Sequence, residues 1–235
     1  ENIEQRKNRF FIEGDPGAIL IVEFMEDSME VILDKISSLK KTLTGRNMGY
    51  HFPVITGKNI NKVWSLRKAG LGVLSNIPGD AKPVSVIEDT SVHPENLEKY
   101  IIEFQELMKK YKLDCVYHAH ISVGELHLRP VLNLKDSDDV KIFRQVAEDT
   151  ARLVKKYKGS LSGEHGDGRL RGEFIPLMYN ELIYGWFREV KHTWDPNGVF
   201  NRGKITDTPP FDSYFRHIPG VETQQIETIM DFSDS

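Results

Sequence analysis

Two histidines on a short segment with a central glycine are the strongest chemical signal in the chain. The segment runs from His120 to His127, and Gly124 lies near its midpoint. A hairpin centred on residues 123–124 would place the two histidines opposite each other, with Cβ atoms roughly 4.5–5.5 Å apart, so both rings could bind one metal ion. Two exposed histidines on a surface hairpin are an equally good interpretation of the segment alone. His118 shares the face of His120 and is expected only to flank the pair.

A glycine-rich segment downstream contributes a second pair of candidate groups. Residues 162–168 read Ser-Gly-Glu-His-Gly-Asp-Gly, and their three glycines allow backbone conformations that approach a ligand closely. Glu164 would complete a ligand set with His120 and His127 that suits zinc or manganese and leaves positions open for substrate. His165 would then remain as a general base. A flexible surface loop is the alternative interpretation.

Three cationic side chains could hold a substrate carboxylate. Arg67 and Arg129 could bind it through two parallel hydrogen bonds, and Lys82 could bind it as a point charge. Arg129 is the best placed, because it follows His127 by two residues and so shares its face in a strand. Each of the three is individually more often a solvated or salt-bridged surface charge.

The composition excludes several classes of protein. Lys and Arg number 31 against 35 Asp and Glu, which gives a net charge of -4 and no basic excess for nucleic acid. The longest apolar run, residues 18–22, is far shorter than the ~20 residues of a membrane span. The single cysteine, Cys115, excludes an internal disulfide, and it also excludes an iron–sulfur cluster or a thiolate zinc site built from this chain alone. We expect Cys115 to be buried. We expect a cytoplasmic protein without a membrane span.

The candidate residues lie on a predicted alternation of strands and helices. Apolar runs predict the strands, and 3.6-residue periodicity predicts the helices. An acidic cluster at 136–139 is expected to begin a helix rather than to bind calcium, since acidic residues favour a helix's first turn. The expected strands cover residues 18–24, 50–56, 83–88, 115–120 and 125–132. The expected helices cover residues 28–43, 62–74, 94–111, 136–154 and 176–194.

One hairpin among helical crossovers predicts an α+β fold of ferredoxin-like type. This fold has a mostly antiparallel sheet backed by helices, here with a C-terminal helical segment. After Lys204 the composition becomes polar and proline-containing, which is typical of a linker rather than of a core element.

Taken together, these segments resemble the C-terminal substrate (cap) domain of the FAD-linked oxidases of the vanillyl-alcohol oxidase superfamily. That group contains D-lactate dehydrogenases, the glycolate oxidase flavin subunit and D-2-hydroxyglutarate dehydrogenases. The resemblance covers most of residues 10–205 and runs through five places: Arg67, Lys82, residues 120–127, residues 163–166 and residues 195–204.

The resemblance implies roles for the metal-binding and catalytic groups. It implies zinc or manganese bound by His120, His127 and Glu164, with His165 as the base that removes the hydroxyl proton while a hydride passes from the substrate Cα to the flavin. It also implies that Arg67 and Lys82 contact the substrate carboxylate.

The resemblance further implies where the flavin lies. Gly163, Glu164 and Gly166 are expected near it, as are Asn201 and Lys204, which match an Asn-Pro-Gly-Lys stretch of the family. Arg202 stands where that stretch has proline. Arg129 adds a positive group beyond the usual pair, which favours a dicarboxylate substrate such as D-2-hydroxyglutarate.

The same resemblance implies a larger enzyme. Because the family's FAD-binding domain precedes this region, we expect residues 1–205 to be the cap domain and residues 206–235 a linker in a FAD-dependent D-2-hydroxy-acid dehydrogenase. Residues 120–130, residues 163–168 and Arg171 are similar to a long branch that is fused to an iron–sulfur module, a candidate electron acceptor. Residues 230–233 resemble the junction before that module.

Two other functions stay open from the residues alone. A flavin-free metallohydrolase could use the same two histidines and glutamate with a metal-bound water. A non-catalytic ferredoxin-like ligand-binding module would contain the same histidines in a structural role.

Overall fold

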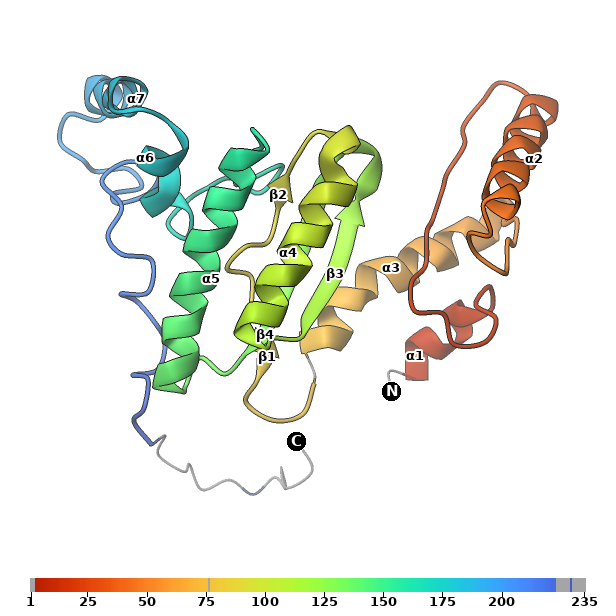
Figure 1. Ribbon diagram of the computed structural model, residues 1–235, viewed down its shortest axis with the longest axis horizontal. Coiled ribbons are helices and arrows are strands. Elements are labelled where there is room, and N and C mark those ends of the chain that lie inside the picture. The colour runs from red at the N-terminus through yellow and green to blue at the C-terminus, as the bar shows by residue number, and fades with distance from the viewer. Residues whose placement is uncertain (1–2, 76, 223–228, 230–235) are drawn as a thin grey trace. The chain divides into compact units, whose positions relative to one another are not determined.

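The protein, seen in a computed structural model, forms two compact units. The structure describes residues 3–75, 77–222 and 229 (Figure 1). The first unit is Glu1–Leu74 and the second is Ser75–Ser235. The resemblance of residues 230–233 to a domain junction lies outside the described residues.

The first unit is mainly helical. Ser28 begins its longest helix, because the serine hydroxyl accepts a hydrogen bond from the Val31 N–H group, which has no partner within the helix. The helices predicted over residues 28–43 and 62–74 are confirmed. The unit contains α1 (Ile3–Arg6), η1 (Lys7–Arg9), α2 (Met29–Gly45), η2 (Gly57–Asn59) and α3 (Ile60–Ser75), of which α3 reaches the unit boundary.

The strands predicted over residues 18–24 and 50–56 are wrong. Neither segment pairs with a strand in the part of the chain that the structure describes. Within the first segment, Ile19 is 51% exposed and Leu20 is 60% exposed. An apolar run becomes a strand only when a neighbouring strand takes up its backbone hydrogen bonds, and composition alone does not report that partner.

The second unit is built on an antiparallel sheet of four strands. The central strand β4 pairs along one side with β3, and along the other side with β1 at one end and β2 at the other. The bounds are β1 (Lys82–Pro83), β2 (Thr90–Ser91), β3 (Cys115–His120) and β4 (Glu125–Leu132). The strands predicted over 115–120 and 125–132 are confirmed.

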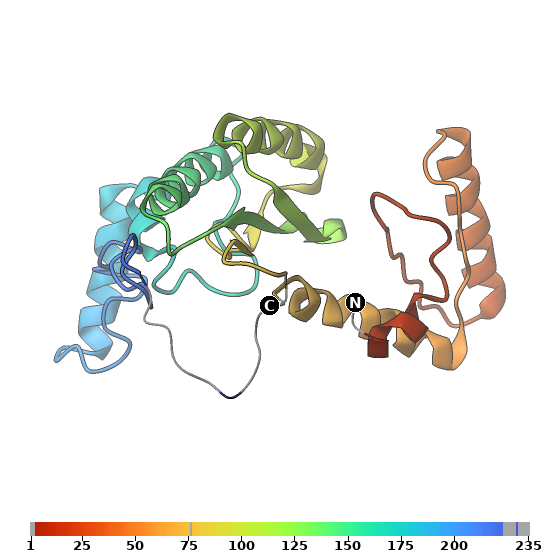
Figure 2. The same cartoon turned by 90° about the horizontal axis from the view of Figure 1, so that it is seen from below.

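Two long helices cover one face of this sheet. The helices α4 (Leu97–Tyr111) and α5 (Ser137–Lys156) pack against each other on the same side of the strands (Figures 1 and 2). Residue 91 also bridges to residue 160 beyond α5. The order is therefore strand, helix, hairpin and helix, followed by a one-residue bridge where the ferredoxin-like pattern has its last strand. The predicted α+β class is confirmed.

The strand predicted over residues 83–88 is wrong for most of its length. Only Pro83 lies in β1, and residues 86–89 form a turn. Val84, Val86 and Ile87 are nevertheless buried in the core. Their apolar character therefore reports burial rather than an extended chain, and the turn brings the polar residues that follow to the start of β2.

Polar side chains cap the beginnings of α5 and α7. The Asp136 carboxylate accepts hydrogen bonds from two N–H groups in the first turn of α5, so the acidic cluster does begin a helix. The single helix predicted over 176–194 is split into α6 (Ile175–Met178) and α7 (Glu181–Trp194), because Asn180 leaves the helical conformation and caps α7.

The helix predicted over 94–111 is confirmed, as η3 (Pro94–Asn96) followed by α4. No helix in the described residues is long and apolar enough to cross a membrane.

Part of the segment expected to be a linker packs against the core. The Phe211 side chain is buried, with its ring 5.3 Å from that of Phe143 and 5.4 Å from that of Phe174. Beside it, the Arg144 guanidinium donates hydrogen bonds of 2.7 Å to the Asp212 carboxylate. The residues around Phe211 thus belong to the second unit, which the linker prediction did not anticipate.

Replacing Phe211 by alanine should lower the free energy of unfolding of the chain by about 3–5 kcal/mol, because a buried phenylalanine leaves a cavity when truncated. Chemical denaturation followed by tryptophan fluorescence measures the change. Tyr214→Ala is the control, since this side chain is 64% exposed and should cost less than about 1 kcal/mol. Equal costs for the two variants would show that the segment lies loosely on the surface.

Candidate metal and catalytic site

The histidine-bearing strands present their polar side chains on the sheet face opposite α4 and α5. Along β4, Leu126 and Leu128 lie in the core that the helices cover. Since side chains alternate between the two faces of a strand, Glu125, His127 and Arg129 lie on the other face. All three are nonetheless largely shielded from solvent.

The hairpin register differs by two residues from the predicted one. His118, rather than His120, lies opposite His127, and His120 lies opposite Glu125. Because the side-chain period of a strand is two, a shift of two residues leaves the three histidines on one face. The predicted pairing is therefore wrong, while the predicted convergence of the histidines holds.

The turn explains this register. It consists of the 3-10 turn η4 (Ile121–Val123) and of Gly124, which has a left-handed φ of 75°. A Cβ at Gly124 would lie 1.9 Å from the carbonyl oxygen of Val92, so only glycine fits there. The loop is thus centred one residue earlier than a symmetric turn around residues 123–124.

Four imidazole rings gather at this face. The ring of His127 is 5.6 Å from that of His118 and 5.3 Å from that of His120, measured between centroids. The ring of His165 stacks on that of His127 at 5.3 Å, with 17° between their planes. His118 is thus a member of the cluster and not merely a flanking residue.

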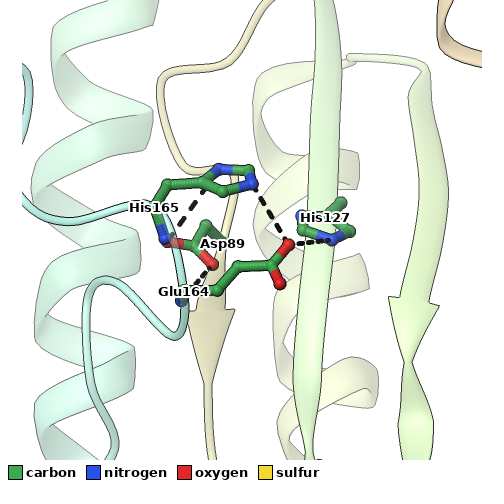
Figure 3. A group of neighbouring side chains, drawn as sticks. All are labelled: Asp89, His127, Glu164 and His165. Atoms are coloured by element: carbon green, nitrogen blue, oxygen red, sulfur yellow. Dashed lines mark hydrogen bonds and ion pairs between the residues drawn. The ribbon is translucent and has the colours of Figure 1, made fainter.

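Glu164 and His165 come from the glycine-rich loop and are held there by Asp89 (Figure 3). The fully buried Asp89 carboxylate accepts hydrogen bonds of 2.9 Å from the backbone N–H groups of Glu164 and His165, and another from the Ser162 hydroxyl. The Asp89 carbonyl accepts a hydrogen bond of 2.7 Å from the Gly163 N–H.

The Glu164 carboxylate lies among three histidines from both parts of the site. Its Oε1 atom is 3.8 Å from His120 Nε2, 3.7 Å from His127 Nε2 and 3.2 Å from His165 Nε2. Metal ligands that lie about 2.1 Å from one ion are about 3–3.5 Å from each other when they are adjacent. The observed spacings are close to that requirement.

Two groups of described side chains have donor atoms within 4.8 Å of one another and could share an ion. They are Asp89, His127, Glu164 and His165, and His120, Glu125 and Glu164. Glu164 belongs to both groups, whereas the two predicted histidine ligands fall into different ones. The ligand set of His120, His127 and Glu164 therefore stays a prediction.

Burial favours the neutral form of His127 by lowering the pKa of its imidazole. The negative charge of Glu88 acts to raise this pKa, and the neighbouring rings of His120 and His165 act to lower it further. A neutral imidazole is the form that binds a metal. The His127 Nε2 atom is the one that faces Glu164, while its Nδ1 atom is buried, 3.8 Å from Glu88 and without a hydrogen-bond partner among the described residues.

Two neighbouring carboxyl groups have opposite pKa shifts. Burial raises the pKa of Glu125 to about 7, and the hydrogen bond with Asp89 and the charge of Glu164 raise it too. Burial also acts to raise the pKa of Asp89, but the hydrogen bonds from Ser162, Glu164 and His165 outweigh it and hold the pKa well below its ordinary value. Asp89 is therefore the charged member of the pair at neutral pH.

Of the predicted carboxylate-binding cations, the two in the second unit lie at different positions along β4. Arg129 reaches the site, where its guanidinium forms an ion pair with Glu88. Lys82 lies opposite Leu132, roughly 17 Å along β4 from His127, and its ammonium donates to a backbone carbonyl. Arg67 lies on α3 in the first unit, with its guanidinium 5.8 Å from the centroid of the Trp64 ring.

The residues expected near the flavin lie in two places. Asn201 and Lys204 follow α7, where the lysine ammonium donates a 2.9 Å hydrogen bond to the asparagine side chain. Gly163 packs on the site itself, since a Cβ there would lie 3.0 Å from Glu125 Cγ. Gly166 has a φ of 84° and open space at its Cα, so it serves the turn of the loop.

Sequence reasoning missed three of the groups that complete the site. Glu88 and Asp89 form a polar pair directly after the buried residues 84–87, and that change from apolar to acidic is the signal that could have found them. Arg171, noted only as a mark of resemblance, is buried, and its guanidinium donates hydrogen bonds to the carbonyls of Gly166 and Glu88. It thereby ties the loop to the start of β2.

Cys115 should be unreactive in the folded chain, because burial raises the pKa of its thiol to about 12. Only the thiolate is nucleophilic, and its fraction at pH 8 falls by about 10³ relative to an unfolded thiol of pKa near 9. Iodoacetamide labelling followed by mass spectrometry should therefore be about 10³-fold slower in the folded chain than in denaturant. The side chain is only partly buried, contrary to the prediction of full burial, and similar rates in the two conditions would contradict the raised pKa of its thiol.

Comparison with known proteins places these residues in a family. A family model described as FAD linked oxidases, C-terminal domain, matches residues 3–205. The D-2-hydroxyglutarate dehydrogenase of Haemophilus influenzae is 35% identical over 216 residues, which are 88% of this chain and 21% of the relative. That of Escherichia coli is 32% identical over 208 residues, which are 86% of this chain and 20% of the relative. The chain thus spans about a fifth of the length of these curated relatives.

Proposed function

We propose that this chain, which belongs to the family of C-terminal domains of FAD-linked oxidases, is the substrate- and metal-binding domain of a FAD-dependent D-2-hydroxy-acid dehydrogenase. The observation that carries the proposal is the convergence of His120, His127, Glu164 and His165 on one sheet face. The family favours this function over a flavin-free metallohydrolase and over a non-catalytic ligand-binding module.

In this proposal His120, His127 and Glu164 hold a divalent cation, zinc or manganese. Two imidazoles and one carboxylate are a donor set that suits both metals. The lowered pKa of His127 and the close approach of Glu164 Oε1 to both histidines support it. A cation bound there would act as a Lewis acid on the substrate hydroxyl and lower the pKa of that hydroxyl.

His165 is suited to take the hydroxyl proton. Its Nε2 atom faces Glu164 and hence the place where the substrate would bind. Its Nδ1 atom is 3.8 Å from Glu88 and 4.0 Å from Asp89. In this proposal Nε2 takes the proton of a substrate hydroxyl bound beside Glu164. FAD supplies the two-electron acceptor.

The proposed substrate is a small 2-hydroxy acid. The relatives named D-2-hydroxyglutarate dehydrogenase favour a dicarboxylate over D-lactate or glycolate. Arg129 is a candidate contact for a substrate carboxylate near His127, and its present partner is Glu88. Arg67 and Lys82 are proposed to bind the substrate in the complete enzyme.

The remaining assignments concern the larger protein. We propose that residues 1–205 form the cap domain, that residues 206–235 lead toward a further module, and that a separate domain holds most of the FAD. Gly163, Gly166, Asn201 and Lys204 would face the flavin. In this proposal an iron–sulfur module accepts the electrons from the flavin. The protein is proposed to be cytoplasmic.

Anaerobic reduction of the flavin in the complete protein tests this function. A panel of D- and L-2-hydroxy acids is mixed with the oxidised protein, and the loss of the flavin's visible absorbance is followed. D-2-Hydroxyglutarate should bleach the flavin and its L-enantiomer should not. A colourless protein with chelator-sensitive esterase or amidase activity would instead support the metallohydrolase.

A further inference from the structure

We propose that Asp89 is the positioning residue of this site. It fixes the loop that bears Glu164 and His165 beside the histidines of β3 and β4. Three independent observations support this role. The chemical roles of Glu164 and His165 rest on the proposed function. The claim that Asp89 holds these two residues in place does not.

The backbone of Asp89 connects the two halves of the site. Its N–H donates a hydrogen bond of 3.0 Å to the carbonyl of Leu126 in β4, while its carbonyl accepts one of 2.7 Å from Gly163 in the loop. Its φ of 77° lies in the left-handed region, which costs a non-glycine residue on the order of 1 kcal/mol. The surrounding hydrogen bonds keep the residue in this conformation.

The carboxylate of Asp89 is already occupied by donors from the protein. An ionised carboxylate has about four lone-pair sites. The backbone N–H groups of Glu164 and His165 and the Ser162 hydroxyl each donate a hydrogen bond to it. Asp89 belongs to a group with metal-ligand spacing, but three of its roughly four lone-pair sites already accept hydrogen bonds from the loop. Its role is therefore to hold the loop rather than to ligate.

The loop depends on this anchor. Three glycines between residues 163 and 168 leave its backbone with many accessible conformations in the absence of external contacts. Two successive N–H groups point at one buried carboxylate, and such charge-assisted hydrogen bonds are about twice as strong as neutral ones. Glu164 and His165 are the two side chains that this pair of bonds sets in place.

Asp89→Asn in the complete protein tests the proposal. Asparagine keeps the shape of the side chain but replaces one acceptor oxygen with an NH₂ donor, so it cannot accept both backbone N–H groups and the Ser162 hydroxyl. The matched control is Asp149→Asn. Asp149 accepts hydrogen bonds of 2.7 Å from Lys110 and Tyr111 between the two long helices, remote from the site in sequence and on the other face of the sheet.

Two measurements distinguish positioning from a general loss of stability. In metal-free protein, amide hydrogen exchange at residues 164 and 165 should be more than about 10-fold faster in Asp89→Asn, with exchange in α4 and α5 unchanged. Zinc affinity, measured by competition with a chromophoric chelator, should fall about 10–100-fold, the usual effect of losing a group that orients a ligand. Asp149→Asn should change neither quantity at the site.

The outcomes separate this inference from the proposed function. Exchange rates and zinc affinity within about twofold of wild type in Asp89→Asn would overturn the role of Asp89. If wild-type protein binds no zinc or manganese, the proposed metal site fails, and the exchange rates still decide whether Asp89 holds the loop. Should Asp89→Asn not fold, Ser162→Ala removes one donor to the same carboxylate, and unchanged exchange at residues 164 and 165 in that variant would also overturn the proposal.

Discussion

Replacement of His165 by alanine is expected to slow substrate-driven flavin reduction in the complete enzyme by about 10²–10⁴-fold, the usual contribution of a general base. The imidazole Nε2 lies 3.2 Å from Glu164 Oε1, beside the proposed metal ligands, and in the proposal it takes the proton of the substrate hydroxyl. Alanine removes that acceptor. Because His165 is half-exposed and its side chain fills no core position, the variant should keep its fold.

Stopped-flow mixing of substrate with oxidised protein under anaerobic conditions measures this rate. The control is His192→Ala, an exposed histidine on α7, which should leave the rate unchanged. The variant should also lose the pH dependence that reports the base in the wild-type enzyme. A near-normal rate of flavin reduction in His165→Ala would remove this residue from the chemistry.

The second large effect is expected from Glu164→Gln, which should weaken binding of zinc or manganese by about 10²–10³-fold. Structural zinc sites bind with about 10–16 kcal/mol shared among four ligands, so one ligand contributes about 2.5–4 kcal/mol. Glutamine keeps the size of the side chain but loses the charge that faces three imidazoles. Flavin reduction should fall together with the metal content.

Elemental analysis after dialysis, with affinity measured by chelator competition, checks this expectation. Glu106→Gln is a matched control, because Glu106 is an exposed residue of α4 whose carboxylate pairs with Lys109. Full retention of metal by Glu164→Gln would show that the Glu164 carboxylate is not a ligand of the ion.

Some of the site could be predicted from the sequence because its physics is local. The alternation of β3 and β4 and the glycine at 124 fix two strands and a tight connection, and their bounds were predicted correctly. The register was not, since η4 and the left-handed Gly124 form a turn that a symmetric loop does not describe. The period of two in a strand kept the histidines together in spite of that error.

Other parts depend on contacts that are distant in sequence. Asp89 accepts its hydrogen bonds from residues more than 70 positions away, so no local pattern marks it as part of the site. The same holds for Phe211, whose burial follows from Phe143 and Phe174 rather than from its polar surroundings in the sequence. Apolar runs at residues 18–24 and 50–56 predicted strands because a run reports hydrophobicity and not the presence of a pairing partner.

The most direct test of the central claim is the rate of anaerobic flavin reduction by D-2-hydroxyglutarate in the complete protein before chelation, after removal of metal, and after return of zinc or manganese. The account predicts a fall of about 10²-fold or more on chelation, because Lewis-acid activation contributes several kcal/mol, and recovery when one of the two metals is returned. An unchanged rate in protein that elemental analysis shows to be metal-free would contradict a metal site at His120, His127 and Glu164.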